Sequence, residues 1–220
     1  MKRAVLFDMD GILFDSEPWY IRETRNWMKN LGFQGTEQDV SVIIGMRTAD
    51  AYHVLSGLLE NRYSIDELRN ANETWFREHP VDAKQLMFEG VDTVLHQLKE
   101  EGFLTACCSS SRRRSVIPAL EKMGILELFD VILCGDEQFA PKPAPDIYLK
   151  AAEMLGVSPS QCIVYEDSAR GIASGKNAGM TVIARKDDRF RQDQSRADAL
   201  VSDIYEMHAL AAEGGNICRK

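Results

Sequence analysis

The sequence predicts an α/β protein, a doubly wound parallel sheet with an inserted all-helical segment. Short apolar segments typical of strands alternate with amphipathic helical patterns along most of the 220 residues. That alternation favours a parallel sheet covered by helices on both faces. The alternation stops between about residues 16 and 86, where helical patterns continue without a strand pattern. Polar residues directly follow several of the predicted strands, which places them at one edge of the sheet.

Six segments are the predicted strands, because they are short, apolar and bounded by turn residues. They are residues 3–7, 103–108, 130–134, 162–165, 181–184 and, shorter, 199–201. Helices are predicted between them, where apolar residues recur three and four positions apart, over 91–98, 116–123 and 147–155. Gly124 and Gly156 stand where glycine ends a helix.

The inserted segment has its own apolar pattern. Residues 51–59 carry one stripe, and Ser64-x-x-Glu67 is a capping box that opens a further helix. We therefore predict two domains, a core of residues 1–15 and 87–220 and a helical domain of residues 16–86. The chain passes between them twice, which makes a two-stranded hinge.

The composition excludes some functions. The formal net charge of −8 opposes non-specific binding to nucleic acid, which needs a basic surface. The apolar run before Asp8 is too short for a signal peptide or a membrane span. Four of the five cysteines lie in apolar strand-like segments, as expected of reduced core residues in the cytoplasm. We expect a cytoplasmic monomer without nucleic-acid or membrane partners.

Asp8 and Asp10 directly follow the first predicted strand. Buried charges are costly unless they are paired or bound to a metal. Ser109 and Asp167 also follow strands, so these side chains should converge beyond the carboxyl ends of the sheet. The pattern indicates a divalent ion and a reacting group at that edge.

Four motifs together resemble the haloacid dehalogenase superfamily. They are D-x-D-G-x-x-x-D-S from Asp8, the strand ending in Ser109, K-P-x-P at Lys142, and E-D-S-x-x-G from Glu166. The subgroup resembled is the small-molecule phosphatases that also include β-phosphoglucomutase. The resemblance implies a Rossmann-like catalytic core and a helical cap that closes over the substrate.

The resemblance also implies the catalytic roles. Asp8 would be the nucleophile that forms an aspartyl-phosphate, and Asp10 the general acid and base. Ser109 would bind the phosphoryl oxygens. Lys142, fixed between two prolines, would balance the charge of Asp8 and the phosphate.

The implied cofactor is Mg²⁺, which prefers oxygen ligands. Its ligands would be the carboxylates of Asp8 and Asp167 and the backbone carbonyl of Asp10. Glu166 would take part directly or through water.

Substrate specificity is less readable from the sequence. Gly45 and Arg47 match a cap loop that faces the active site in the family, and Tyr20 follows the hinge. Ser110 and Arg112 follow Ser109. We include these five residues as candidates for substrate binding.

The leading hypothesis is a Mg²⁺-dependent phosphatase of a small phosphorylated metabolite, a sugar or sugar-alcohol phosphate. β-Phosphoglucomutase is the alternative within the family, but Tyr20 replaces the mutase's cap histidine, Thr48 its arginine, and Arg47 is displaced by one position. A non-enzymatic module that only holds phosphate on an aspartate is the alternative from another class.

Overall fold

The computed structural model describes residues 3–44, 46, 48–190 and 192–213. The chain divides into two compact units. The core unit comprises the residues up to Asp15 together with those from Asp82 onward, and the helical unit is Ser16–Val81. The second boundary thus lies five residues before the predicted one. The reason is α5 (Ala83–Leu86), which packs against α7 (Arg113–Met123) of the core unit.

The described residues of the core unit form a six-stranded parallel sheet in the order β3-β2-β1-β4-β5-β6. The strands are β1 (Ala4–Phe7), β2 (Leu104–Cys108), β3 (Val131–Leu133), β4 (Cys162–Glu166), β5 (Thr181–Arg185) and β6 (Ala199–Val201). Each lies within one residue of its predicted bounds at either end. The predicted α/β fold class is confirmed.

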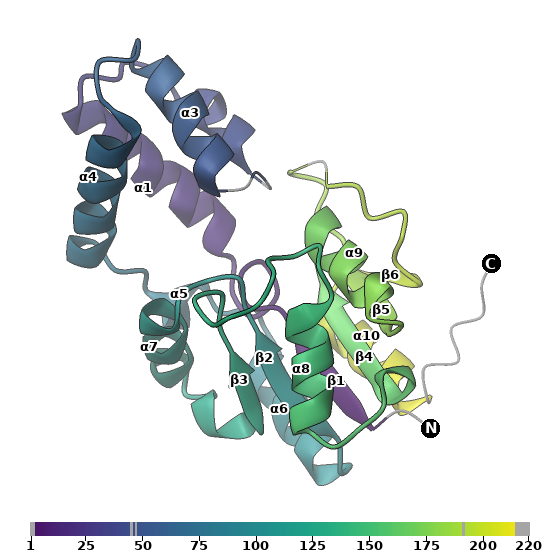
Figure 1. Ribbon diagram of the computed structural model, residues 1–220. Helices are drawn as coiled ribbons and strands as arrows, with labels where there is room; N and C mark the ends of the chain where they lie inside the picture. Colours follow the sequence, from purple (N-terminus) through teal and green to yellow (C-terminus); the bar gives the residue numbers. More distant parts are fainter. Residues whose placement is uncertain (1–2, 45, 47, 191, 214–220) are drawn as a thin grey trace. The chain divides into compact units, whose positions relative to one another are not determined.

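Helices cover both faces of this sheet (Figure 1). On one face, α8 (Asp146–Met154) and α9 (Ala169–Asn177) pack on the strands and bury an apolar cluster that includes Leu6, Val164 and Ile172. Behind the sheet in Figure 1 lie α6 (Val91–Glu100) and α10 (Ile204–Ala212), which contact each other. Short 3₁₀ turns occupy Leu126–Leu128 (η2) and Pro159–Gln161 (η3).

The first strand lies in the middle of the sheet. Ala4 pairs with Leu104 of β2 on one side and with Cys162 of β4 on the other. The pairing continues past the strand, because the N–H of Asp8 donates to the carbonyl of Tyr165 at 3.0 Å. The central strands therefore carry their following residues to the same edge of the sheet.

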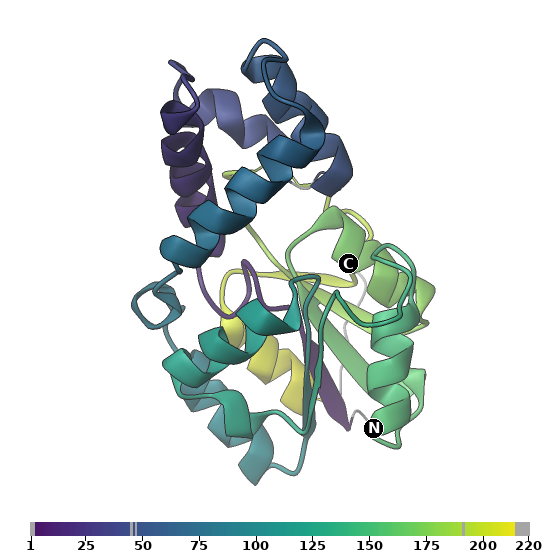
Figure 2. The same ribbon diagram turned by 60° about the vertical axis from the view of Figure 1, so that its left-hand side comes forward.

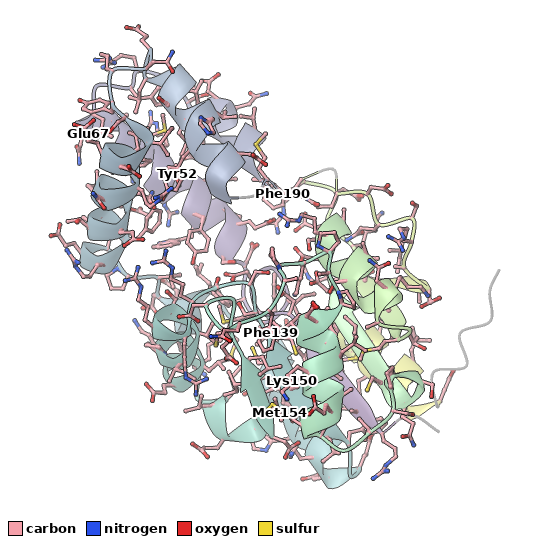
Figure 3. All side chains as sticks on the ribbon, in the orientation of Figure 1. Tyr52, Glu67, Phe139, Lys150, Met154 and Phe190 are labelled. Carbon is pink, nitrogen blue, oxygen red and sulfur yellow. The ribbon has the colours of Figure 1, made fainter. Side chains whose placement is uncertain are left out.

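The helical unit contains α1 (Ser16–Asn30), α2 (Glu37–Val40), η1 (Ser41–Ile43), α3 (Thr48–Leu58) and α4 (Ile65–Glu78), shown from a second side in Figure 2. The predicted capping box opens α4, with the Glu67 carboxylate 2.8 Å from the N–H of Ser64. An apolar core holds α1, α3 and α4 together, with Leu68 fully buried. Tyr52 of α3, labelled in Figure 3, donates to Asn72 of α4 at 3.1 Å.

Two further features of the described residues concern membrane-spanning helices and cysteines. None of their helices combines the length and the apolar character that crossing a bilayer requires. Their four cysteines, at positions 107, 108, 134 and 162, are buried free thiols.

Candidate active site

Lys142 and Asp8 form a buried ion pair at the carboxyl edge of the sheet. Nζ of Lys142 lies 2.6 Å from Oδ1 of Asp8 and 2.8 Å from Oε1 of Glu166. It also donates to the carbonyl of Cys108 at 3.0 Å. The three side chains come from the loop before α8, the end of β1 and the end of β4. The fold thus brings the predicted catalytic lysine to two predicted carboxylates.

Glu166 is held on both of its carboxylate oxygens. Oε1 accepts from Lys142 and, at 3.0 Å, from the hydroxyl of Tyr148 on α8. Oε2 accepts from the N–H groups of Asp167 and Ser168 at 3.0 and 3.1 Å, and from the Ser168 hydroxyl. Gly171 leaves room for this carboxylate, since a Cβ there would lie 1.6 Å from Oε1. The carboxylate is therefore rigid and fully buried.

Three carboxylates gather where a cation would fit. Asp8, Glu166 and Asp167 each offer an oxygen atom, and these oxygens lie within 4.8 Å of one another. Gly11, at φ 75°, lies against Asp167, where a Cβ would be 2.3 Å from Oδ2. A set of buried oxygen ligands with an excess of negative charge suits a hard divalent cation such as Mg²⁺. The residues present therefore fit the cofactor that the sequence predicts.

Asp10 has a different environment from these three. Its Oδ2 accepts a hydrogen bond of 2.8 Å from the hydroxyl of Ser111. The N–H of Ser111 in turn donates to Oγ of Ser109 at 3.0 Å. The turn after β2 therefore links the predicted acid–base residue to the predicted phosphoryl-binding serine. Ser109 itself is buried, and its N–H continues the sheet by donating to Leu133.

The charges in this site influence one another. Burial raises the pKa of Asp8 to about 7, and the charges of Glu166 and Asp10 act in the same direction, against Lys142. Burial would also raise the pKa of Glu166, but Lys142 and the hydrogen bonds outweigh it and the pKa is lowered. The pKa of Lys142 rises because Asp8 and Glu166 outweigh its burial. The lysine therefore stays charged, and of these two carboxylates Asp8 is the more easily protonated without a cation.

The predicted substrate-binding residues belong to both units of the chain. Gly45 and Arg47 lie outside the described residues. Tyr20 belongs to the helical unit, where its ring contacts those of Trp19 and Phe76 at centroid distances of 4.9 and 5.7 Å. Ser110 and Arg112 are exposed on the turn that leads into α7, with Arg112 at its N-cap. Their roles remain predictions.

The structure adds two residues that sequence reasoning did not assign. Ser111 contacts Asp10, whereas the sequence analysis gave roles to Ser109 and Ser110 and none to Ser111. Tyr148 contacts both Lys142 and Glu166. The sequence signal that could have identified Tyr148 was its position six residues after Lys142, on the buried face of a predicted helix.

The fold and the site define an α/β enzyme with a carboxylate and lysine centre at the edge of a parallel sheet. The model of the haloacid dehalogenase-like hydrolases matches residues 5–185. The chain belongs to this family.

Named relatives are similar over most of their length. The chain is 32% identical to the phosphorylated carbohydrates phosphatase of Thermotoga maritima, covering 80% of this chain and 82% of that protein. It is 30% identical to the validoxylamine A 7'-phosphate phosphatase of Streptomyces hygroscopicus subsp. limoneus, covering 94% and 96%. A solved hydrolase of the same family from Deinococcus radiodurans R1, with bound phosphate and sodium, superposes with a TM-score of 0.76 at 25% identity, covering 97% and 96%. Membership of this family, together with the similarity to named phosphatases, identifies the chain as a phosphoric monoester hydrolase.

Proposed function

We propose that this protein is a Mg²⁺-dependent phosphatase that hydrolyses a small phosphorylated metabolite, a sugar or sugar-alcohol phosphate, through an aspartyl-phosphate on Asp8. The observation that carries the proposal is the contact of Lys142 with Asp8 beside the buried carboxylates of Glu166 and Asp167. The named substrates of the two phosphatase relatives, phosphorylated carbohydrates and validoxylamine A 7'-phosphate, support the substrate class.

In the first proposed step, a carboxylate oxygen of Asp8 attacks phosphorus. The bond between phosphorus and the ester oxygen breaks, and Asp10 donates a proton to the leaving alcohol. In the second step, Asp10 takes a proton from water while that water attacks phosphorus. The bond from phosphorus to Asp8 breaks, which releases inorganic phosphate and restores the carboxylate.

The remaining residues stabilise charge during these steps. Lys142 fixes Asp8 and offsets negative charge on the phosphoryl group, and Ser109 is proposed to bind the phosphoryl oxygens. Asp8 and Asp167 would hold the cation, with the Asp10 carbonyl and with Glu166 through water, because both Glu166 oxygens already accept several hydrogen bonds. The bound Mg²⁺ would supply Lewis-acid stabilisation of the phosphoryl charge.

Departures from the mutase pattern favour hydrolysis over return of the phosphoryl group to a sugar. In a mutase, the aspartyl-phosphate must survive while the substrate reorients, so water must stay poorly activated. Tyr20 occupies the position of the mutase's cap histidine, and histidine is the side chain whose ordinary pKa allows it to gain and lose a proton near neutral pH. We therefore propose that water reaches the phosphorylated Asp8 with Asp10 as its base. We further propose that the enzyme acts as a monomer in the cytoplasm.

The test of this function measures phosphate released from a panel of phosphorylated metabolites and from p-nitrophenyl phosphate, with Mg²⁺ and with EDTA. We expect sustained turnover that EDTA abolishes and Mg²⁺ restores. Asp8→Asn should remain folded and be inactive, and it should fail to bind beryllium trifluoride, a phosphoryl mimic that the unchanged protein binds. Full activity in EDTA, or in the Asp8→Asn variant, would refute the proposal.

A second assay separates the phosphatase from the mutase. The protein is supplied with β-glucose 1-phosphate and a trace of glucose 1,6-bisphosphate, and both glucose 6-phosphate and inorganic phosphate are followed. We expect phosphate to be the dominant product. Glucose 6-phosphate formed about tenfold faster than phosphate, a barrier difference of about 1.4 kcal/mol, would establish the mutase instead.

A further inference from the structure

The side chain of Gln194 joins two backbone carbonyls at the edge of the candidate active site. Its Nε2 donates to the carbonyl of Asp167 at 2.6 Å and to that of Arg185 at 2.7 Å. Gln194 lies on the segment between β5 and β6 and is half-buried. One amide group therefore connects a proposed metal ligand to the end of the neighbouring strand.

The two carbonyls lie just beyond the last pair that joins β4 to β5. Glu166 pairs with Ala184 at the end of this ladder, and Asp167 and Arg185 are the next residues along. After this point β4 leads into α9, whereas Arg185, which also pairs with Val201 of β6, ends β5. The glutamine amide thus extends the connection between β4 and β5 by one residue beyond their ladder.

The backbone around Asp167 is fixed from several directions. Its N–H donates to Oε2 of Glu166 at 3.0 Å, and its carbonyl accepts from Gln194. The next residues begin α9, where Ser168 is the N-cap and the N–H of Ala169 donates to Oε1 of Gln192 at 3.2 Å. Removal of the Gln194 amide would release the carbonyl side of the Asp167 residue.

A small displacement there would matter because the carboxylate has little space. Oδ2 of Asp167 faces Gly11 so closely that a Cβ at Gly11 would lie 2.3 Å away. Arg185 in turn contacts the backbone of Gly11. Its guanidinium lies over the ring of Phe88 at 4.0 Å, and its Nη1 donates to the Gly11 carbonyl at 3.4 Å. Gln194 therefore contacts the main chain of a residue whose carboxylate has little room to move.

We propose that Gln194 is a positioning residue for the divalent cation, which acts by holding the main chain of Asp167 so that its carboxylate meets that of Asp8. This inference rests on the proposed Mg²⁺-dependent function. Residues that orient a metal ligand typically change metal affinity by about 10- to 100-fold when they are substituted.

Other contacts anchor the same segment independently of Gln194. Asp198 receives hydrogen bonds of 2.6 and 2.7 Å from Lys176, and it accepts from the N–H of Val182 at 2.9 Å. Arg196 donates to Asn177 at 3.2 Å on the exposed side. Loss of the Gln194 amide should therefore affect the cation site more than the order of the segment.

The experiment compares Gln194→Met, which keeps the length of the side chain and removes its N–H donors, with Arg196→Met, which removes an anchor of the same segment away from the site. Cation binding is measured as the rise in Tm during titration with Mg²⁺ and as the loss of the free Mn²⁺ electron paramagnetic resonance signal. We expect Gln194→Met to need about tenfold more of either ion for half-saturation. Arg196→Met should bind both ions as the unchanged protein does.

Kinetics with p-nitrophenyl phosphate provide a second readout. In Gln194→Met, the Mg²⁺ concentration for half-maximal kcat should rise in parallel with the dissociation constant for Mg²⁺. The KM for the aryl phosphate at saturating Mg²⁺ should stay unchanged.

Unchanged cation affinity in Gln194→Met, or an equal loss of affinity in Arg196→Met, would overturn the positioning role. Absence of any Mg²⁺-dependent rise in Tm in the unchanged protein would instead refute the proposed function, and the inference with it. If Gln194→Met does not fold, Gln194→Ala carries the same expectations, because truncation at a half-exposed position removes little packing.

Discussion

The ammonium of Lys142 lies 2.6 Å from a carboxylate oxygen of Asp8, although 134 positions separate the two residues in the chain. The lysine side chain is 6% exposed, so this pair is largely shielded from water. The same ammonium contacts Glu166, and one positive charge therefore serves two buried carboxylates. The stability and the activity of this centre should both depend on that charge.

Lys142→Met should lower kcat by about 10²- to 10³-fold, the usual cost of removing one group that stabilises charge in a transition state. The variant should also lose about 3 to 5 kcal/mol of folding free energy in the absence of a cation, because two buried carboxylates would lose their partner. Steady-state kinetics and urea unfolding measure the two effects. Lys150→Met is the control, since Lys150 lies on α8 with a side chain that is 42% exposed (Figure 3). A kcat within about threefold of the unchanged protein would exclude this role for Lys142.

The raised pKa of Asp8 predicts a pH-dependent stability in EDTA. The pKa lies at about 7 in the folded protein, above the ordinary value of 3.8, so the folded state binds this proton more tightly than the unfolded state. The contribution to stability is therefore fully present below pH 3.8 and is lost as the pH rises through about 7. Asp8→Asn lacks this titration. Between pH 5 and 7.5, the free energy of unfolding should fall more steeply in the unchanged protein than in Asp8→Asn.

Mg²⁺ provides the control for the pH prediction. A bound cation favours the ionised carboxylate, so Mg²⁺ should stabilise the unchanged protein more at pH 7.5 than at pH 5. Urea titrations at both pH values, with EDTA and with Mg²⁺, give the comparison. In EDTA, a difference in unfolding free energy between the unchanged protein and Asp8→Asn that stays constant with pH would show that Asp8 does not titrate between pH 5 and 7.5.

Ser111→Ala should lower kcat by about tenfold, a part of the 10²- to 10⁴-fold that general acid–base catalysis contributes. The hydroxyl of Ser111 holds Oδ2 of Asp10, and its loss leaves that carboxylate less well oriented. The KM for p-nitrophenyl phosphate should change little, because the phosphoryl-binding groups remain in place. Ser115→Ala, at an exposed serine on α7, is the matched control. An increase in KM with unchanged kcat would instead indicate that Ser111 binds substrate.

Leu68→Ala should destabilise the helical unit by about 2 to 5 kcal/mol, since Leu68 is fully buried in its apolar core. Hydrogen exchange followed by mass spectrometry can localise this effect. Protection should fall in α1, α3 and α4, and it should persist in the central strands of the core unit. Val42→Ala, at a residue that is 51% exposed in the same unit, should leave protection unchanged. Equal loss of protection in β1 and β4 would show that the two units unfold together.

The sequence could predict the sheet because its strands are short apolar runs that end in polar residues. The apolar patterns at 103–108 and 199–201 nearly coincide with the observed strands β2 and β6. Local sequence therefore fixes the ends of these two strands with little help from tertiary contacts. The second domain boundary was harder to predict. Residues 83–86 follow the inserted segment without a strand pattern to separate them from it, and the packing of α5 against α7 assigns them to the core unit.

The candidate site could be predicted only in part for a similar reason. Asp8, Lys142, Glu166 and Asp167 stand in motifs, and the structure places them together. The choice of Ser111 as the partner of Asp10 depends on the conformation of the turn after β2, which no periodicity encodes. Gln194 lies in a polar segment that resembles an ordinary connection, and its importance comes from the two carbonyls that the fold brings within its reach.

The central place of β1 has a consequence for the order in which the protein is completed during synthesis. The first strand leaves the ribosome well before its neighbours in the sheet, which contain Leu104 and Cys162. Contacts between distant parts of a chain form slowly and leave apolar strands exposed in the meantime. Until Lys142, Glu166 and Asp167 have all emerged, the nascent chain carries Asp8 without the lysine and the carboxylates that gather around it in the folded protein. We therefore expect the proposed site to be complete only after β4, which ends in Glu166, has paired with β1 in the middle of the sheet.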